Sequence, residues 1–221
     1  MVDIFDEVSD DLRAERTMLL ARRYGGLLVV LLVLVLVGVG AQQAYRWHQT
    51  QLNDKAATAF LALIGPIDRS GPNLTDPQRL QDAQSLTAFA ATAPDGYKTL
   101  AAFRAASLYS DAGQPAQAEA LWTGIGRDSS ADPLLRDLAN LLWAQHALGT
   151  APDADVLARL QPLAALSNPY HGMAQETQAL VYWHEGNTDL AKALFSQIAS
   201  DPATPEGVRN RANGLLAQLN G

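Results

Sequence analysis

Hydrophobic residues form one unbroken run near the start of the chain, from Tyr24 to Ala41. The run, YGGLLVVLLVLVLVGVGA, contains no charged or strongly polar side chain, and the charge-free stretch spans 22 residues before Arg46. A helix of about 20 residues crosses a hydrocarbon core of about 30 Å, because each residue adds about 1.5 Å. Within lipid, a helix also satisfies every backbone polar group inside one segment. The pattern therefore predicts a transmembrane helix over residues 24–44, with membrane lipid around it.

A cleaved signal peptide is the alternative interpretation of the same run. The small residues Gly38, Gly40 and Ala41 resemble a cleavage site. However, the preceding segment is long and carries six acidic residues. The apolar run also exceeds the ~7–15 residues of a typical signal-peptide core. We therefore expect an anchor that stays in the mature protein.

The charges that flank the run predict its orientation. Four arginines precede it, at positions 13, 16, 22 and 23, whereas only Arg46 lies close behind it. Positive residues concentrate on the cytoplasmic side of membrane proteins. The N-terminus is therefore expected in the cytoplasm and the C-terminal domain across the membrane.

Residues 1–23 have the pattern of an amphipathic helix in the cytosol. Ile4, Phe5, Val8 and Leu12 recur on one face, and acids and arginines occupy the other positions. Two interpretations remain open. The segment is either a docking helix for a cytosolic surface or a juxtamembrane helix whose arginines contact lipid headgroups.

The hydrophobic pattern stays helical after the span, as far as Ile64. We predict that Gly65–Pro66 ends this helix, so that residues 45–75 form an exit helix and a loop. Tyr45 and Trp47 have the aromatic character of residues at a membrane interface. A new helix is predicted from Asp76, as N-cap, and Pro77, as the first helical residue.

The chain then repeats itself over residues 76–221, with glycines 113, 149 and 186 as nearly evenly spaced anchors. Five positions have the same offsets from the first and the last of these glycines: Ala106, Tyr109, Gly113, Ala118 and Trp122 match Ala179, Tyr182, Gly186, Ala191 and Phe195. A weaker middle copy has Leu142, Gly149, Ala154 and Ala158. The spacing resembles the tetratricopeptide repeat, which has a period of about 34 residues.

These positions have a physical meaning in stacked helical hairpins. Small alanines let the two helices of a hairpin approach, and a glycine permits the left-handed backbone that ends the first helix. Further units are predicted to begin at Pro133, Pro169 and Pro205, after Asp132, Asn168 and Thr204 as caps. Residues 205–220 have an apolar face and an opposite polar face, which is the pattern of a capping helix. We therefore predict an all-α fold, a transmembrane helix followed by a tetratricopeptide-like solenoid of about three hairpins. The first unit is expected to be half a hairpin, whose partner is the continuing membrane helix.

Composition and motifs predict no enzyme. The net charge is −7 with no basic patch, so nucleic acid is not expected as a partner. The chain has no cysteine, Gly124-Ile125-Gly126 is a lone GxG, and Thr188 replaces the second histidine of a zinc-protease motif that His184 begins. The four histidines lack metal-ligand spacing. No catalytic, cofactor-binding or metal site is therefore predicted.

The remaining functional feature is a surface. In a tetratricopeptide array, the first helix of each hairpin lines the concave side, and the glycine anchors place ten residues there: Phe103, Ser107, Ser110, Trp143, His146, Met173, Glu176, Leu180, Trp183 and His184. Met and aromatic side chains suit an adaptable groove for extended, partly apolar segments. The alternative is that the aromatic residues among them form the core between repeats.

The N-terminal DIFDEVSDDLRAER is followed by RRYG, one span and degenerate repeats. With these features, of which the N-terminal motif is the most specific, the whole chain, residues 1–221, resembles the bacterial ancillary SecYEG translocon subunit family (YfgM-like proteins). This likeness implies a single-pass protein of the bacterial inner membrane with a periplasmic repeat domain. The resemblance implies that the N-terminal anchor associates with the SecYEG channel and that the periplasmic repeats assist exported or periplasmic proteins as chaperones. A second hypothesis is a structural adaptor in envelope assembly or cell division that holds a stable protein partner. The sequence leaves the client and the oligomeric state open.

Overall fold

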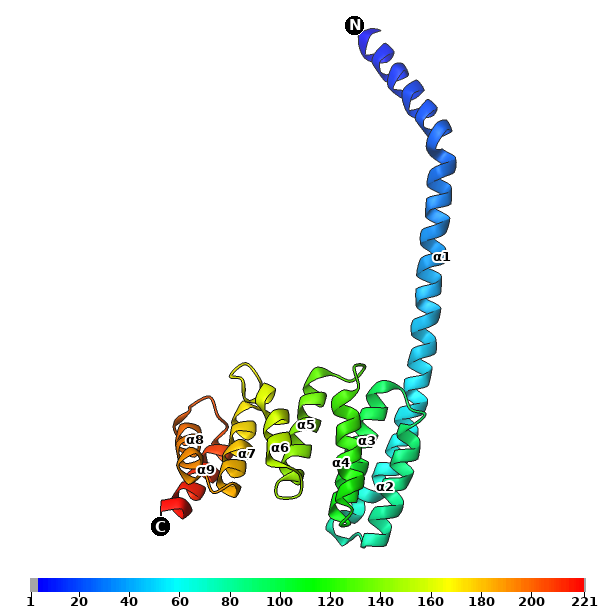
Figure 1. The fold of residues 1–221 in the computed structure, drawn as a ribbon. Coiled ribbons are helices and arrows are strands. Elements are labelled where there is room, and N and C mark those ends of the chain that lie inside the picture. The colour runs from blue at the N-terminus through cyan, green and yellow to red at the C-terminus, as the bar shows by residue number, and fades with distance from the viewer. Residues whose placement is uncertain (1–3, 221) are drawn as a thin grey trace. The chain divides into compact units, whose positions relative to one another are not determined.

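The computed structural model describes the backbone of residues 4–220, and it describes the surroundings of residue 26 and of the side chains of residues 29–220. The chain divides into two compact units, Met1–Asp54 and Lys55–Gly221. Helix α1, Ile4–Ser70, forms the described part of the first unit and contributes its last residues to the second (Figure 1). Every regular element in residues 4–220 is a helix. The predicted all-α fold class is thus confirmed.

The first unit contains the apolar run. Residue 26 and residues 29–44 are exposed, with Val29 at 62% and Val37 at 63%. Helix α1 is the one helix in the described part that is long and apolar enough to cross a membrane, with a mean hydropathy of 1.7 in its most apolar window. This agrees with a single span or a signal anchor. The predicted amphipathic face of residues 1–23 lies outside the described side chains.

The second unit continues with eight α-helices that pack mainly on their neighbours in the chain (Figure 1). They are α2 (Asp76–Ala90), α3 (Asp95–Asp111), α4 (Pro115–Arg127), α5 (Pro133–Ala147), α6 (Asp153–Leu160), α7 (His171–His184), α8 (Thr188–Ser200) and α9 (Glu206–Asn220). Two short 3₁₀ segments, η1 (Gly71–Asn73) and η2 (Gln161–Ala164), follow α1 and α6.

The three predicted hairpins are α3/α4, α5/α6 and α7/α8, with α9 as the capping helix. The alanines predicted to allow close approach are fully buried in the first and third hairpins: Ala106, Ala118, Ala179 and Ala191. Trp122 and Phe195 fill the space beside them and are also buried. The repeat alignment is therefore confirmed for these two hairpins.

A fourth hairpin precedes them, formed by the end of α1 and helix α2. The Phe60 and Phe89 rings stack with their centroids 6.1 Å apart, and Ile67 is 2% exposed in a cluster with Leu86. The end of the long apolar helix α1 therefore replaces the first helix of this hairpin, as expected. The second compact unit begins at Lys55 and thus includes this part of α1.

The predicted end of this helix at Gly65–Pro66 was wrong, because α1 continues to Ser70. A proline inside a helix removes one backbone hydrogen bond and costs about 3 kcal/mol. Burial of a side chain such as Ile67 is worth about 1.5–3 kcal/mol, and Phe60, Leu63 and Ile64 pack in the same cluster. The packing of the helix end therefore offsets the cost of Pro66.

Three predicted helix starts also shift, and one is confirmed. The N-cap of α2 is Thr75 rather than Asp76, and its N–H donates to Gln78 Oε1 at 2.9 Å. Helix α7 begins at His171, because Asn168 forms a turn in which its Oδ1 accepts from the Tyr170 N–H at 2.9 Å. Helix α9 begins at Glu206, and Thr204 donates its hydroxyl to Asp201. Asp132 caps α5 as predicted, accepting from the Leu134 N–H at 2.8 Å.

The glycine turns explain why the middle hairpin departs from the other two. Gly113 and Gly186 have φ of 70° and 80°, and the residue after each donates to the carbonyl of Tyr109 or Tyr182 at 2.8 Å. These are Schellman ends of a helix. Gly149 also has a positive φ of 75°, but Leu148 before it is extended, so the chain forms a type II turn.

Because of this turn, the second helix of the middle hairpin begins later after its glycine than the second helices of the other two hairpins. Helix α6 begins at Asp153, the fourth position after its glycine, whereas α4 and α8 begin at the second position after theirs. The predicted inner positions Ala154 and Ala158 are consequently exposed. Val156 and Leu160 occupy the interior instead, fully buried. The alignment of the middle repeat is corrected accordingly.

Two equivalent hydrogen-bonded pairs close the first and third hairpins. Lys98 Nζ lies 2.5 Å from Asp128 Oδ2, and His171 Nε2 lies 3.4 Å from Asp201 Oδ2. Lys98 and Asp128 lie equally far in sequence before and after Gly113. His171 and Asp201 lie before and after Gly186 at that same sequence distance, so the two pairs occupy equivalent positions. Each carboxylate also accepts from the backbone N–H of the second residue after it, at 3.0 Å and 2.9 Å. The start of the first helix is thereby joined to the end of the second.

Overpacking tests the close approach of the helices. The substitution Ala191→Leu should cost about 1–3 kcal/mol, because Ala191 is fully buried against the facing helix. Each kcal/mol lowers Tm by about 2–4 °C in a domain of this size, which thermal unfolding followed by circular dichroism can measure. The matched control Ala193→Leu lies at an exposed position of the same helix and should leave Tm unchanged. Equal Tm values for the two variants would contradict the packing.

The Lys98–Asp128 pair predicts a defined pH dependence of stability. Hydrogen bonds from Lys98 and Ser130 lower the pKa of Asp128 from 3.8 to about 2, and the bond to Asp128 raises the pKa of Lys98. The contribution of Asp128 is therefore complete above pH 3.8 and is lost as the pH falls towards 2. The contribution of Lys98 is complete below pH 10.5 and is lost above that pH.

We expect Asp128→Asn to be less stable than the parent at pH 6 and to approach the parent near pH 2. Urea unfolding of both proteins at several pH values measures this difference. Asp111→Asn, at an exposed position outside the pair, serves as the control. A stability loss in Asp128→Asn that stays constant from pH 6 to pH 2 would show that the ion pair does not contribute.

Candidate functional site

The ten residues predicted for the groove all lie on the first helices of the three hairpins. Three are on α3, two on α5 and five on α7. In each of the three hairpins, the structure therefore places these residues on the first helix. Their exposure differs strongly, however, and it divides them into three groups.

Two of the ten residues are buried in the packing of the array. Trp143 is 8% exposed in the core, and the Arg159 guanidinium carbon lies 3.6 Å from the centroid of its ring. Burial lowers the pKa of Arg159, and the charge of Arg127 adds to this effect. Glu176 is 6% exposed and accepts two hydrogen bonds from Arg211, at 2.8 Å and 2.6 Å. These bonds raise the pKa of Arg211 and join α7 to the capping helix.

Four apolar residues are half-buried and form the margin of the core. Phe103 packs against the central cluster, and Leu180 and Trp183 pack against the C-terminal cluster. Met173 contacts both clusters. A half-buried side chain keeps one face for a partner, so these residues combine a packing role with an accessible apolar surface. Ser107 is half-buried on the same helix as Phe103.

The remaining polar residues connect successive repeats. Ser110 Oγ lies 3.2 Å from His146 Nδ1 of the next hairpin, and the His146 ring stacks on Trp122 at 4.6 Å. His184 Nδ1 lies 3.1 Å from Asp153 Oδ2. The Ser110–His146 contact joins the first helices α3 and α5, and the His184–Asp153 contact joins α7 to α6, the second helix of the preceding hairpin.

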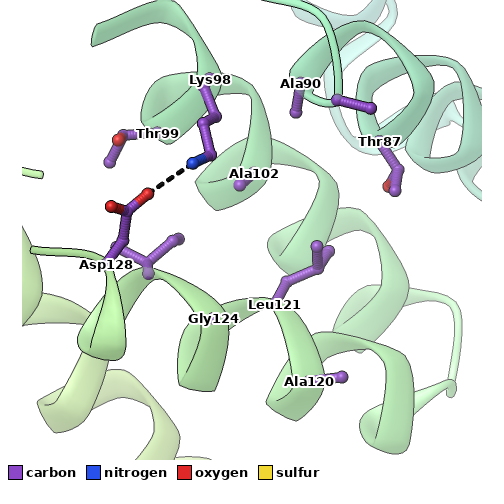
Figure 2. Close-up of a pocket in the computed structure, with 11 residues that line it drawn as sticks. Thr87, Ala90, Lys98, Thr99, Ala102, Ala120, Leu121, Gly124 and Asp128 are labelled. Atoms are coloured by element: carbon purple, nitrogen blue, oxygen red, sulfur yellow. Dashed lines mark hydrogen bonds and ion pairs between the residues drawn. The ribbon is translucent and has the colours of Figure 1, made fainter. Parts of the chain in front are cut away.

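The structure also contains a cavity that the sequence reasoning missed. It has a volume of about 350 Å³ and lies among α2, α3 and α4, with Lys98 and Asp128 at one side (Figure 2). Most of its lining is small or apolar, including Ala90, Leu121 and Gly124. A Cβ at Gly124 would meet no atom within 4 Å, so the first glycine of the GxG at 124–126 borders open space.

The second glycine of that motif has a packing role. A Cβ at Gly126 would lie 2.7 Å from Asn140 Oδ1, because α4 and α5 approach closely at this point. Among the described residues, no group of three or more His, Asp or Glu side chains is arranged to hold a metal ion.

Comparison with known proteins places this architecture in a family. The model of the tetratricopeptide repeat-like domain matches residues 21–214. No curated protein and no solved structure matches the chain. The match covers most of the chain, from the apolar run to the capping helix. The chain therefore belongs to the tetratricopeptide repeat-like domain family.

Proposed function

We propose that this protein is a non-enzymatic, membrane-anchored module that binds other proteins. The observation that carries the proposal is the joining of one exposed apolar helix to an array of tetratricopeptide-like hairpins in a single chain. Repeat arrays of this kind present extended surfaces for protein–protein interaction. The apolar helix confines that surface to the vicinity of a membrane.

The distribution of charges supports the orientation, and the family resemblance supports the membrane. The arginines before the span favour a cytoplasmic N-terminus. The N-terminal motif resembles proteins of the bacterial inner membrane, which places the proposed repeat domain in the periplasm. Exported chains enter this space through the SecYEG channel, and the N-terminal sequence resembles the ancillary subunits of that channel. The proposed role is therefore that of an ancillary subunit of the SecYEG translocon that assists the handling or folding of exported proteins.

The proposed contact surface is the half-buried apolar margin of the first helices. Phe103, Met173, Leu180 and Trp183 retain accessible apolar area, whereas Trp143 and Glu176 are used in packing. Met and aromatic side chains adapt to partners of varied shape, which suits unfolded clients. The inter-repeat contacts of His146 and His184 keep this surface in a fixed arrangement.

Site-specific crosslinking tests the proposed surface. A photoreactive phenylalanine derivative at position 107, beside Phe103, should capture an exported chain that is arrested during translocation. The same group at position 117, which is exposed on the second helix α4, serves as the matched control. The expected result is capture at position 107 and little at position 117. Capture at both positions equally, or only within the same chain, would contradict the proposed surface.

Copurification tests the proposed association with the channel. The full chain in mild detergent should retain SecYEG components, and a variant that lacks residues 1–45 should lose them, because the anchor is the proposed contact. Quantitative immunoblotting of the channel subunits measures this difference. Retention by the shortened variant would move the contact to the repeat domain. Recovery of a different partner in fixed stoichiometry with the full chain would instead favour a structural adaptor.

A further inference from the structure

Arg136, on the first helix of the middle hairpin, is a half-buried cation without a partner. Among the described residues, no side chain or carbonyl forms a hydrogen bond or an ion pair with its guanidinium. Its Nε atom is enclosed, whereas its two Nη atoms are not. A polar group that is removed from water without a partner costs free energy. An added acceptor at the accessible end of this guanidinium would therefore be stabilising.

The acidic residues of α5 that lie nearest to Arg136 in the sequence are engaged elsewhere. Asp132, one helical turn before it, caps the helix by accepting from the Leu134 N–H at 2.8 Å. Asp137, the next residue, accepts from the side chain of Asn168 at 2.7 Å, in the turn before α7. The helix that carries Arg136 thus provides no carboxylate for it.

Two other arginines show what is particular to Arg136. Arg211 is bound by the carboxylate of Glu176 at 2.6 Å, so its charge is balanced within the chain. Among the described residues, Arg127 also has no carboxylate partner, but it is exposed at the end of α4, where water can satisfy it. Arg136 combines the missing partner with partial burial. Coulomb attraction to an anion is stronger in such surroundings than at a fully exposed position.

Arg136 lies in a row with two apolar residues of the neighbouring first helices. Helices α3, α5 and α7 each end at the second position before their turn glycine. Leu100, Arg136 and Met173 lie at equal sequence distances before these glycines. Leu100 is 45% exposed and Met173 is half-buried. The three successive first helices therefore present an apolar, a cationic and an apolar side chain at equivalent positions.

The chemistry of this row favours an acidic side chain of a polypeptide. A guanidinium binds a carboxylate through two parallel N–H···O bonds, and the two accessible Nη atoms can form such a pair. One arginine balances the charge of one carboxylate. A phosphate monoester carries a charge of about −1.5 to −2 and is typically bound by a cluster of arginines. The apolar residues on both sides match apolar side chains that flank the acid.

We infer that Arg136 selects an acidic side chain in an extended, partly apolar segment of a partner polypeptide. The inference deepens the proposed function and rests on it, because it takes the partner to be a protein. The enclosed part of the arginine side chain holds the guanidinium in place before the partner binds, so less conformational entropy is lost on binding. Leu100 and Met173 contact the apolar residues on either side of the acid.

Photocrosslinking to a designed peptide tests the inference on the full chain in detergent micelles. Packed helices lie about 8–10 Å apart and an extended chain advances about 3.3 Å per residue, so side chains three residues apart match neighbouring first helices. The probe is Gly-Leu-Ser-Ala-Glu-Ser-Ala-Bpa-Gly, where Bpa is p-benzoylphenylalanine. Biotin at its N-terminus and an amide at its C-terminus leave glutamate as the single charged group. The control peptide has glutamine in place of glutamate.

We expect the glutamate peptide to label the chain several-fold more than the glutamine peptide. Labelling is measured by streptavidin blotting at peptide concentrations up to about 1 mM, which is sufficient to detect weak binding. Mass spectrometry of the product should place the crosslink on α3 or α7, the helices on either side of α5.

Three arginine variants show whether Arg136 is responsible. Arg136→Gln should reduce labelling by the glutamate peptide to the level of the glutamine peptide. Arg127→Gln removes the same charge from an exposed position of the second helix α4 and should leave the labelling unchanged. Arg136→Lys keeps the charge but not the paired hydrogen bonds, so its labelling should lie between these values. Circular dichroism of the three variants confirms that they fold.

Four outcomes would overturn the inference. These are equal labelling by the two peptides, full labelling of Arg136→Gln, equal losses in Arg136→Gln and Arg127→Gln, and displacement of the glutamate peptide by an equal concentration of phosphatidylglycerol in the micelles. The third outcome indicates a general effect of charge, and the fourth a site for a lipid headgroup.

The failure of this inference and the failure of the proposed function give different results. Equal labelling by both peptides, together with capture of an exported chain at position 107, would retain the binding of polypeptides and remove the selection of an acid. Absence of labelling by both peptides, together with absence of capture at position 107, would contradict the proposed function itself.

Discussion

The constraint on which this structure depends is that no single hairpin can bury its own apolar face. Each hairpin must pack on a neighbour, and the packing distance is set by alanines that have no exposed surface, such as Ala106 and Ala179. The same constraint explains the beginning and end of the array. At one end, the last residues of α1 provide the missing partner for α2, even though Pro66 interrupts their hydrogen bonding. At the other end, α9 covers the C-terminal cluster with Val208 and Ala212.

The periodic part of the fold could be predicted because its signal is a matter of spacing. Gly113 and Gly186 permit the left-handed backbone at the end of a helix, and the alanines around them permit close contact between helices. Five matching offsets were therefore sufficient to align the first and third hairpins. The middle hairpin could not be aligned in this way. Gly149 has the same sign of φ, but the turn type depends on the extended backbone of Leu148, which residue identity alone does not reveal.

The site was less predictable than the fold, since exposure depends on contacts between distant residues. Glu176 has the sequence character of a groove residue, yet Arg211 of the capping helix holds it within the core. Conversely, the cavity is formed by what is small or missing at Ala90 and Gly124. Absent side chains leave a weak trace in a single sequence.

The short second helix of the middle hairpin has a further consequence for the array. Helix α6 has 8 residues, whereas α4 and α8 have 13 each, so the nearest-neighbour coupling through the middle of the array has a smaller interface than the coupling at either side. In a quasi-one-dimensional array, cooperativity is weakest at the smallest interface. Partial unfolding of the repeat domain is therefore expected to begin at α6, because this helix has the smallest interface with its neighbours. The hairpins on either side keep their own longer helices and their own packing.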